Sequence, residues 1–426
     1  MKSRHSAVAL AAASTVLLLA GCAATGDAPE GDVVTLKLES WRAEDATVWE
    51  KTIIPAFEKA HPEINIEYTP TKATEYDAAL ASRFEGGTAG DLIMCRPGAI
   101  NRVSIEKGYL EPLTGFEVLD VFDETALSSW NSAEGEPYCV PTASVSAGFF
   151  YNKAIFEELG LEVPATEAEF MDVLQAIQDD GTYTPLSFGV TPADSWAAEF
   201  MGLYNIGPNY WKGEEGHQGL IDGTKKFSDP EFVEALTVLE SWTPYLPEGA
   251  TAVTYADSIQ LFALGQAAIF PSGSWDINGV TANGLDVGVF APPLPEAGAD
   301  LYMQSQPDQG VGINAASEHK EEAKVFLEWA ASAEFSQLYG DALPGFFGMS
   351  GAEVSLDNAL SNEFATLLAS AQLTPRLGQD QLSGGTPDFS SNMRNLVQQM
   401  MSGALTPQEV AEQGQAQLES WYAPQQ

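Results

Sequence analysis

The chain has few basic residues. Its 426 residues contain 19 Lys and Arg against 60 Asp and Glu, so its formal net charge is −41 at pH 7. A protein that binds nucleic acid or an anionic lipid surface needs a basic face, because Lys and Arg neutralise the phosphate groups. The composition therefore argues against both partners. The acidic residues are scattered along the chain, and we interpret them as a solubility device of the surface.

Histidine is also scarce, with four residues in the chain. His61, His217 and His319 are far apart and lack the spacing of metal ligands. The sequence contains no Gly-x-Ser-x-Gly nucleophile elbow and no phosphate-binding loop of the P-loop type. A chain with 60 Asp and Glu residues contains pairs of carboxylates by chance, so their presence does not indicate glycosidase chemistry. We therefore expect a protein without catalysis, metal or cofactor.

Long apolar runs are limited to the N-terminal end. A basic start is followed by apolar residues from 7 to 18 and by the run Leu19-Ala20-Gly21-Cys22. This order is typical of an export signal, and the run is too short for a membrane span, which needs about 20 apolar residues. The cysteine resembles that of the bacterial lipobox, whose thiol receives a diacylglycerol. A plain secretory signal with a chance cysteine is the alternative.

The lipobox predicts the fate of the first 31 residues. Residues 1–21 are expected to be a removed lipoprotein signal peptide, Cys22 the lipidated N-terminus, and 22–31 a flexible tether. No later apolar run is long enough to cross a bilayer. We therefore expect the protein on the extracellular face of the cell membrane, attached through its N-terminal lipid only.

Two further cysteines, Cys95 and Cys139, remain in the mature chain. An even number in an exported protein suggests one disulfide. Two buried free thiols that pack as small hydrophobic side chains are the alternative.

Strand and helix patterns alternate after the tether. β-branched and alternating segments predict strands, and 3.6-residue periodicity predicts helices between them. In order, the pattern predicts strand 33–38, helix 47–60, strand 64–68, helix 75–85 and strand 91–94. This order is typical of a mostly parallel α/β sheet. Capping boxes predict three later helix starts, namely Thr166 with Glu169, Ser228 with Glu231, and Thr406 with Glu409.

Four segments together resemble a known family. They are the first strand ending in Trp41, the run Gly148–Leu161, the run Gly265–Trp275 and the run Gly312–Leu327. In order and spacing they are similar to family 1 of the extracellular solute-binding proteins, the maltose-binding-protein-like receptors of ABC importers of sugars.

The resemblance implies an α/β fold of two lobes with a ligand cleft between them. Carried onto this chain, it places residues 32–142 and 300–335 in lobe 1, and residues 143–299 and 336–426 in lobe 2. Ligand binding would close the lobes by a hinge movement. The expected partners are a sugar and the permease subunits of the transporter, and the expected state is a monomer.

A sugar has apolar C–H faces and an equator of hydroxyls, so its pocket needs aromatic rings and polar groups. Trp275 follows a strand and a Pro-Ser-Gly-Ser loop, and strand ends are where open α/β sheets bind ligands. The resemblance implies that Trp275 stacks on sugar; core packing is the alternative. Asp276 beside it is expected to accept from hydroxyls, with helix capping as the alternative.

Other candidate ligand residues also follow strands or proposed crossings. Arg96 follows the third strand, with a structural ion pair as its alternative. Asp194 lies in a turn before a helix, where N-capping is the alternative. Asp308 precedes the strand at Gly310, in a loop near a crossing. The complete set of predicted ligand residues is Trp41, Glu44, Arg96, Asp194, Trp196, Trp275, Asp276, Asp308 and Phe346.

The sequence thus predicts a lipid-anchored carbohydrate receptor of an ABC importer. The 9 Trp and 13 Tyr favour an oligosaccharide, because an extended ligand can stack on several rings. A surface lipoprotein that hydrolyses glycans is the alternative function. An adhesion or structural lipoprotein is a third.

Overall fold

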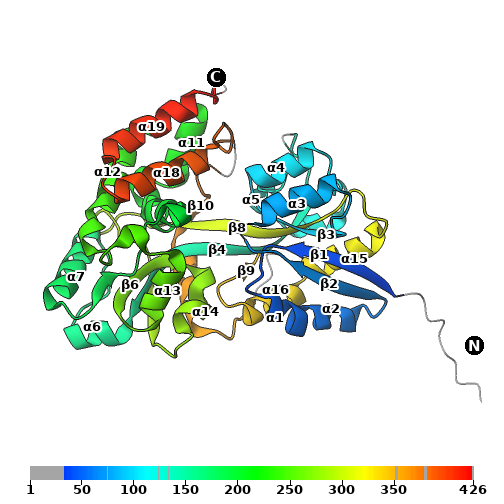
Figure 1. Cartoon of the computed structure of the whole chain (residues 1–426), viewed down its shortest axis with the longest axis horizontal. Helices are drawn as coiled ribbons and strands as arrows, with labels where there is room; N and C mark the ends of the chain where they lie inside the picture. Colours follow the sequence, from blue (N-terminus) through cyan, green and yellow to red (C-terminus); the bar gives the residue numbers. More distant parts are fainter. Residues whose placement is uncertain are drawn as a thin grey trace, which may run out of the picture.

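The computed structural model describes residues 33–73, 75–122, 124–132, 134–350, 354–378 and 381–424. These residues form two α/β lobes that lie side by side and are joined by long strands (Figure 1). The two-lobed architecture predicted from the resemblance is therefore confirmed. The predicted signal peptide, Cys22 and the tether lie outside the described residues.

The first lobe is built around three strands that the alternating pattern predicted. In β2 (Ile64–Pro70) alternate side chains Ile64, Ile66 and Tyr68 are buried, whereas all four residues of β3 (Leu92–Cys95) are buried. The remaining elements of this lobe are β1 (Val34–Ser40), α1 (Ala46–Val48), a π-helical turn (Trp49–Ile53), α2 (Ile54–Ala60), α3 (Tyr76–Glu85), α4 (Ala99–Glu106), a 3-10 turn (Glu117–Val121), α5 (Glu124–Ser128), α15 (Lys320–Ala330) and α16 (Ala333–Ala342).

Among the residues that the structure describes, the second lobe contains more helices than the first and four strands of the sheet. Its strands are β5 (Thr184–Leu186), β6 (Ala267–Gly273), β7 (Val287–Phe290) and β10 (Gln372–Thr374). Its helices are α6 (Lys153–Leu159), α7 (Glu167–Asp180), α8 (Ser195–Ala197), α9 (Tyr204–Ile206), α10 (Pro208–Trp211), α11 (Glu214–Asp222), α12 (Pro230–Ser241), α13 (Tyr255–Ala263), α14 (Ile277–Thr281), α17 (Ala359–Ser370), α18 (Phe389–Met401) and α19 (Pro407–Glu419). A π-helical turn spans Ala198–Leu203, and 3-10 turns span Pro192–Asp194, Thr243–Tyr245, Ala250–Ala252 and Ser274–Asp276.

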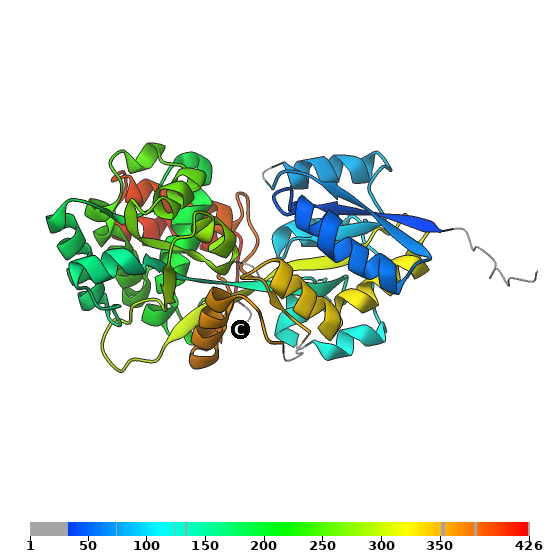
Figure 2. The same cartoon turned by 90° about the horizontal axis from the view of Figure 1, so that it is seen from below.

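Two long strands pass from one lobe into the other (Figure 2). β4 (Cys139–Asn152) and β8 (Tyr302–Ile313) are antiparallel partners across the junction. The beginning of β4 pairs with the end of β8 in the first lobe, and its end pairs with β6 and β7 in the second. A third connection enters through β9 (Phe347–Gly348), which pairs with β4. The sheet order is β2-β1-β3-β8-β4-β6-β5, with β1, β2 and β3 mutually parallel as predicted.

Two local predictions were wrong because strand pairing extends further than the sequence pattern indicates. Asp308 does not lie in a loop before the strand at Gly310, since β8 begins at Tyr302 and pairs with β4 through the crossing. Likewise Pro271 and Ser272 belong to β6 rather than to a loop. Trp275 still follows directly after this strand, in the 3-10 turn Ser274–Asp276.

The core consists of two clusters of buried apolar side chains. One contains residues of the second lobe, from Phe149 to Phe290 and from Leu360 to Leu418. The other contains first-lobe residues and continues through Tyr339 to Phe346. The predicted lobe boundaries remain proposals. Because Tyr339 and Phe346 pack in the cluster of first-lobe residues, we propose that the third crossing lies after Phe346 rather than at residue 335.

The helix starts show how local sequence signals act. The capping boxes at Thr166 and Thr406 are both present, with reciprocal side-chain and backbone hydrogen bonds. The capping box at Ser228 was a wrong prediction, because Asp229 is the N-cap residue and makes no side-chain cap bond. Proline at the first helical position supports this start instead. Within the described ranges, no helix is long and apolar enough to cross a membrane.

Candidate functional site

Trp41 lies at the inner end of β1. This strand starts at the outer edge of the first lobe and runs toward the second lobe (Figure 1). The indole is 4% exposed and meets the ring of Tyr76 edge-on at 5.7 Å. The guanidinium of Arg96 lies 4.8 Å from the centre of the Trp41 ring. Arg96 also pairs with Asp77 at 3.1 Å and donates to the carbonyl of Ala73 at 2.7 Å. Arg96 thus makes the structural ion pair that was the alternative to a ligand contact, and at the same time it covers Trp41.

Arg42, the residue after Trp41, is the centre of a compact charge cluster. It pairs with Glu44 at 3.2 Å and donates through Nε to Asp45. Burial opposes the positive charge of Arg42, but the two carboxylates outweigh it and raise the pKa of the guanidinium. Glu44 is exposed, whereas the Arg42 and Asp45 side chains are each 13% exposed. In this part of the site, the charge of Arg42 is therefore already balanced by Glu44 and Asp45.

Asp308 and Phe346 lie where the chain passes between the lobes. Burial raises the pKa of Asp308, and the positive charges of Arg42 and Arg96 oppose this rise. The Cζ atom of Arg42 lies 4.7 Å from the centre of the Phe346 ring, which is 2% exposed. The arginine therefore connects the end of β1 with two of the crossing segments.

The second lobe contributes a hydrogen-bonded chain centred on Tyr255, the first residue of α13. The indole Nε1 of Trp275 donates to the Tyr255 hydroxyl at 2.8 Å, and that hydroxyl donates to Oδ1 of Asp276 at 2.6 Å. The hydroxyl of Ser272 donates to the other oxygen of Asp276. Asp276 thus does not cap the following helix, since its side chain makes no cap bond there.

Burial affects both titratable groups of this chain. It raises the pKa of Asp276 to about 6, although the bonds from Ser272 and Tyr255 and the charge of Arg42 act in the opposite direction. It also raises the pKa of Tyr255 well above the usual value. The Tyr255 hydroxyl therefore stays protonated at neutral pH and serves as both donor and acceptor.

The remaining predicted residues of the second lobe surround Tyr255. Asp194 accepts a hydrogen bond from the Tyr255 backbone N–H at 2.9 Å, the first N–H of α13, and makes no cap bond to the helix that directly follows it. The ring of Trp196 meets the Tyr255 ring edge-on at 4.8 Å. Phe200 stacks on Trp275 at 5.2 Å with an interplanar angle of 13°. Several aromatic rings are thereby gathered at the end of β6.

The two halves of this site face each other. The charge of Arg42 in the first lobe lowers the pKa of Tyr255 and of Asp276 in the second. Trp275 packs against the core clusters of both lobes. The structure therefore brings the predicted residues from strand ends of both lobes into one region. We call this region the interlobe site, defined by Trp41, Arg42, Glu44, Asp45, Asp77, Arg96, Asp194, Trp196, Tyr255, Trp275, Asp276, Asp308 and Phe346.

Four members of the interlobe site were not among the predicted ligand residues, namely Arg42, Asp45, Asp77 and Tyr255. The position of Arg42 directly after Trp41 was the signal that it belongs here. Tyr255 is the first residue of α13. Its role depends on the approach of α13 to the end of β6, and no local pattern shows that contact.

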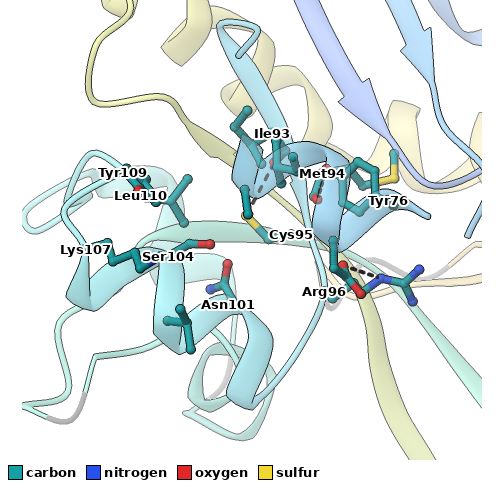
Figure 3. Close-up of a pocket in the computed structure, with 14 residues that line it drawn as sticks. Tyr76, Ile93, Met94, Cys95, Arg96, Asn101, Ser104, Lys107, Tyr109 and Leu110 are labelled. Carbon is teal, nitrogen blue, oxygen red and sulfur yellow. Dashed lines mark hydrogen bonds and ion pairs between the residues drawn. The ribbon is translucent and has the colours of Figure 1, made fainter. Parts of the chain in front are cut away.

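A cavity of about 260 Å³ lies inside the first lobe, between α3, α4 and β3 (Figure 3). Its lining includes Leu80, Ile93, Met94 and Cys95, and it shares Asp77 and Arg96 with the interlobe site. Cys95 is joined to Cys139 by a disulfide that connects β3 with β4. This cavity is mainly apolar and takes nothing from the second lobe, so its chemistry does not suit a hydroxyl-rich ligand. In the part of the chain that the structure describes, no group of three His, Cys, Asp or Glu side chains is arranged to hold a metal ion.

Comparison with known proteins agrees with this architecture. The chain is 25% identical over 341 residues to a multiple sugar-binding protein of Streptococcus mutans, covering 77% of this chain and 78% of that one. It is 30% identical over 338 residues to an uncharacterised lipoprotein of Streptomyces antibioticus, covering 76% and 72%. A solved chitin oligosaccharide binding protein superposes with a TM-score of 0.75 at 22% identity, covering 92% and 99%. The profile of the bacterial extracellular solute-binding proteins matches residues 42–336, and the chain therefore belongs to this family.

Proposed function

We propose that this protein is the lipid-anchored receptor that delivers an oligosaccharide to an ABC importer. The observation that carries the proposal is the composition of the interlobe site. Trp275, Trp196 and Tyr255 supply aromatic surface in the second lobe, while Arg42 and Asp308 supply polar groups from the first lobe and a crossing strand. Aromatic rings beside carboxylates and guanidinium groups match the C–H faces and hydroxyls of a sugar.

The arrangement also supports a hinge mechanism. Each lobe has its own core, and the connections between them are the strands β4, β8 and β9. A ligand that contacts Trp275 from one side and the Arg42 cluster from the other would favour a closed form. Trp196 and Trp275 are both partly exposed and come from different segments of the second lobe. Two separated rings favour an oligosaccharide over a monosaccharide.

Anchoring and partners follow from the same proposal. The lipobox ending in Cys22 would hold the monomeric receptor at the extracellular face of the membrane, near the permease subunits that take over the sugar. The similarity to a lipoprotein of Streptomyces antibioticus supports this placement. The protein needs no cofactor for this task.

Calorimetric titration against a panel of mono- and oligosaccharides tests the proposal. Saturable binding of at least one oligosaccharide with a stoichiometry of one is the expected result. If no saccharide binds and a peptide does, the proposed ligand class is wrong. Release of shorter products from a glycan on long incubation would instead support the alternative, a glycan hydrolase.

A further inference from the structure

Carboxylates outnumber guanidinium groups in the interlobe site. Arg42 and Arg96 are its two arginines, and both are already engaged. The carboxylates are Glu44, Asp45, Asp77, Asp194, Asp276 and Asp308. The chain as a whole carries a formal net charge of −41, so the excess of acidic residues is not limited to this site. The potential that a ligand meets between the lobes is therefore negative.

Neither arginine is free to receive an anionic ligand. Turning Arg42 toward a ligand carboxylate would leave Asp45, whose side chain is 13% exposed, without its partner. Turning Arg96 would break its bonds to Asp77 and to the Ala73 carbonyl. An uncompensated carboxylate that is shielded from water is strongly unfavourable. The arginines of this site therefore neutralise the protein's own acids.

The carboxylates themselves already resist ionisation. Burial raises the pKa of Asp45, Asp276 and Asp308, and the nearby positive charges only partly offset this rise. An added anion would raise these pKa values further, because like charges disfavour each other's ionised form. A neutral ligand adds no charge, and a cationic ligand relieves the repulsion.

We infer that the interlobe site accepts saccharide units that are uncharged or that carry an amine, and that it rejects units with a carboxylate or phosphate. Asp308 is the group that distinguishes these classes, because it lies on a crossing strand next to both arginines. This inference rests on the proposed binding of a saccharide and adds the charge class of the ligand.

The test uses a matched set of ligands and two variants. The panel screened for a melting shift contains neutral oligosaccharides, glucosamine oligomers and oligouronates. For the neutral disaccharide with the largest shift, calorimetry then compares the parent with derivatives in which one hydroxyl is replaced by an amine or C6 is oxidised to a carboxylate. The same titrations are made with Asp308→Asn and with Glu412→Gln, which removes one exposed charge on α19.

The carboxylate derivative is expected to bind at least about tenfold more weakly than its parent, and the amine derivative at least as tightly. Asp308→Asn should reduce the ratio between amine and carboxylate affinities by about fivefold, and this effect should shrink in high salt. Glu412→Gln should leave the ratio unchanged. Equal affinity for parent and carboxylate, or binding of oligouronates alone, would overturn the inference while leaving saccharide binding intact. Failure of every saccharide to bind would overturn both proposals.

Discussion

The indole N–H of Trp275 donates to the hydroxyl of Tyr255 at 2.8 Å. The two residues come from different elements, the 3-10 turn after β6 and the first turn of α13. Because the same hydroxyl donates to Asp276, the orientation of the Trp275 ring depends on a tyrosine 20 residues earlier in the chain. This bond makes the aromatic platform of the second lobe a unit rather than a single exposed ring.

Tyr255→Phe removes the hydroxyl at the centre of this unit. The Trp275 N–H and one oxygen of Asp276 then lose a partner, so we expect about 1–3 kcal/mol of lost stability. Ligand affinity should fall about tenfold, because the indole is no longer held in position. Denaturation and calorimetry measure both effects. The control is Tyr183→Phe, which removes a hydroxyl bonded to exposed Glu158 at 2.8 Å and should leave affinity unchanged.

Trp275→Phe shortens the proposed stacking surface while keeping a ring. We expect about two- to tenfold weaker saccharide binding, since stacking between aromatic rings contributes about 0.5–1.5 kcal/mol and about 1.4 kcal/mol corresponds to tenfold in affinity. Trp421→Phe, at the far end of α19, is the matched control because Trp421 packs only at the edge of the second-lobe core. Equal affinities of the two variants would contradict the role of Trp275.

Asp276→Asn changes the dependence of stability on pH. The folded pKa of about 6 lies above the ordinary value of 3.8, so the native state binds more protons than the unfolded state between these values. Ionisation of Asp276 should therefore lower the unfolding free energy of the wild type as pH rises from 4 to 7, by at most about 3 kcal/mol.

The Asn variant lacks this titration. The difference in unfolding free energy, wild type minus Asp276→Asn, should consequently decrease across that pH range and stay constant above it. Urea denaturation at several pH values measures this difference. Curves that remain parallel from pH 4 to 7 would show that Asp276 titrates normally.

Replacing Cys95 and Cys139 by Ala opens the disulfide between β3 and β4. The bridge joins residues 44 positions apart, and the loss of such a constraint on the unfolded chain should lower stability by about 2–4 kcal/mol. Urea denaturation of the double variant and of reduced wild type should give the same lowered midpoint. Two free thiols in the unreduced wild type would contradict the bridge.

Cys22→Ser removes the predicted lipid attachment site. The variant should appear in the soluble fraction, while its saccharide affinity equals that of the wild type, because the tether is not part of the interlobe site. Fractionation of cells and calorimetry on the released protein check the two statements. Loss of affinity in this variant would contradict the tether.

Local patterns in the sequence determined much of the architecture. The alternation of Ile64, Ile66 and Tyr68 and the apolar run of β3 identify strands, because burial of one or both faces requires those spacings. The capping boxes at Thr166 and Thr406 mark helix starts for an equally local reason, since a side chain reaches a backbone N–H three residues on. The sequence also predicted that aromatic residues such as Trp41 and Trp275 come shortly after strands.

Only the tertiary structure decided how these positions act together. Asp194 looked like a cap for the next helix but bonds to Tyr255, and Asp308 looked like a loop residue but lies in β8. Both outcomes depend on contacts between segments far apart in the chain, which no local spacing encodes. The sequence thus identified side chains that follow strand ends, and packing of the two lobes decided which of them are paired, which are covered and which meet in the interlobe site.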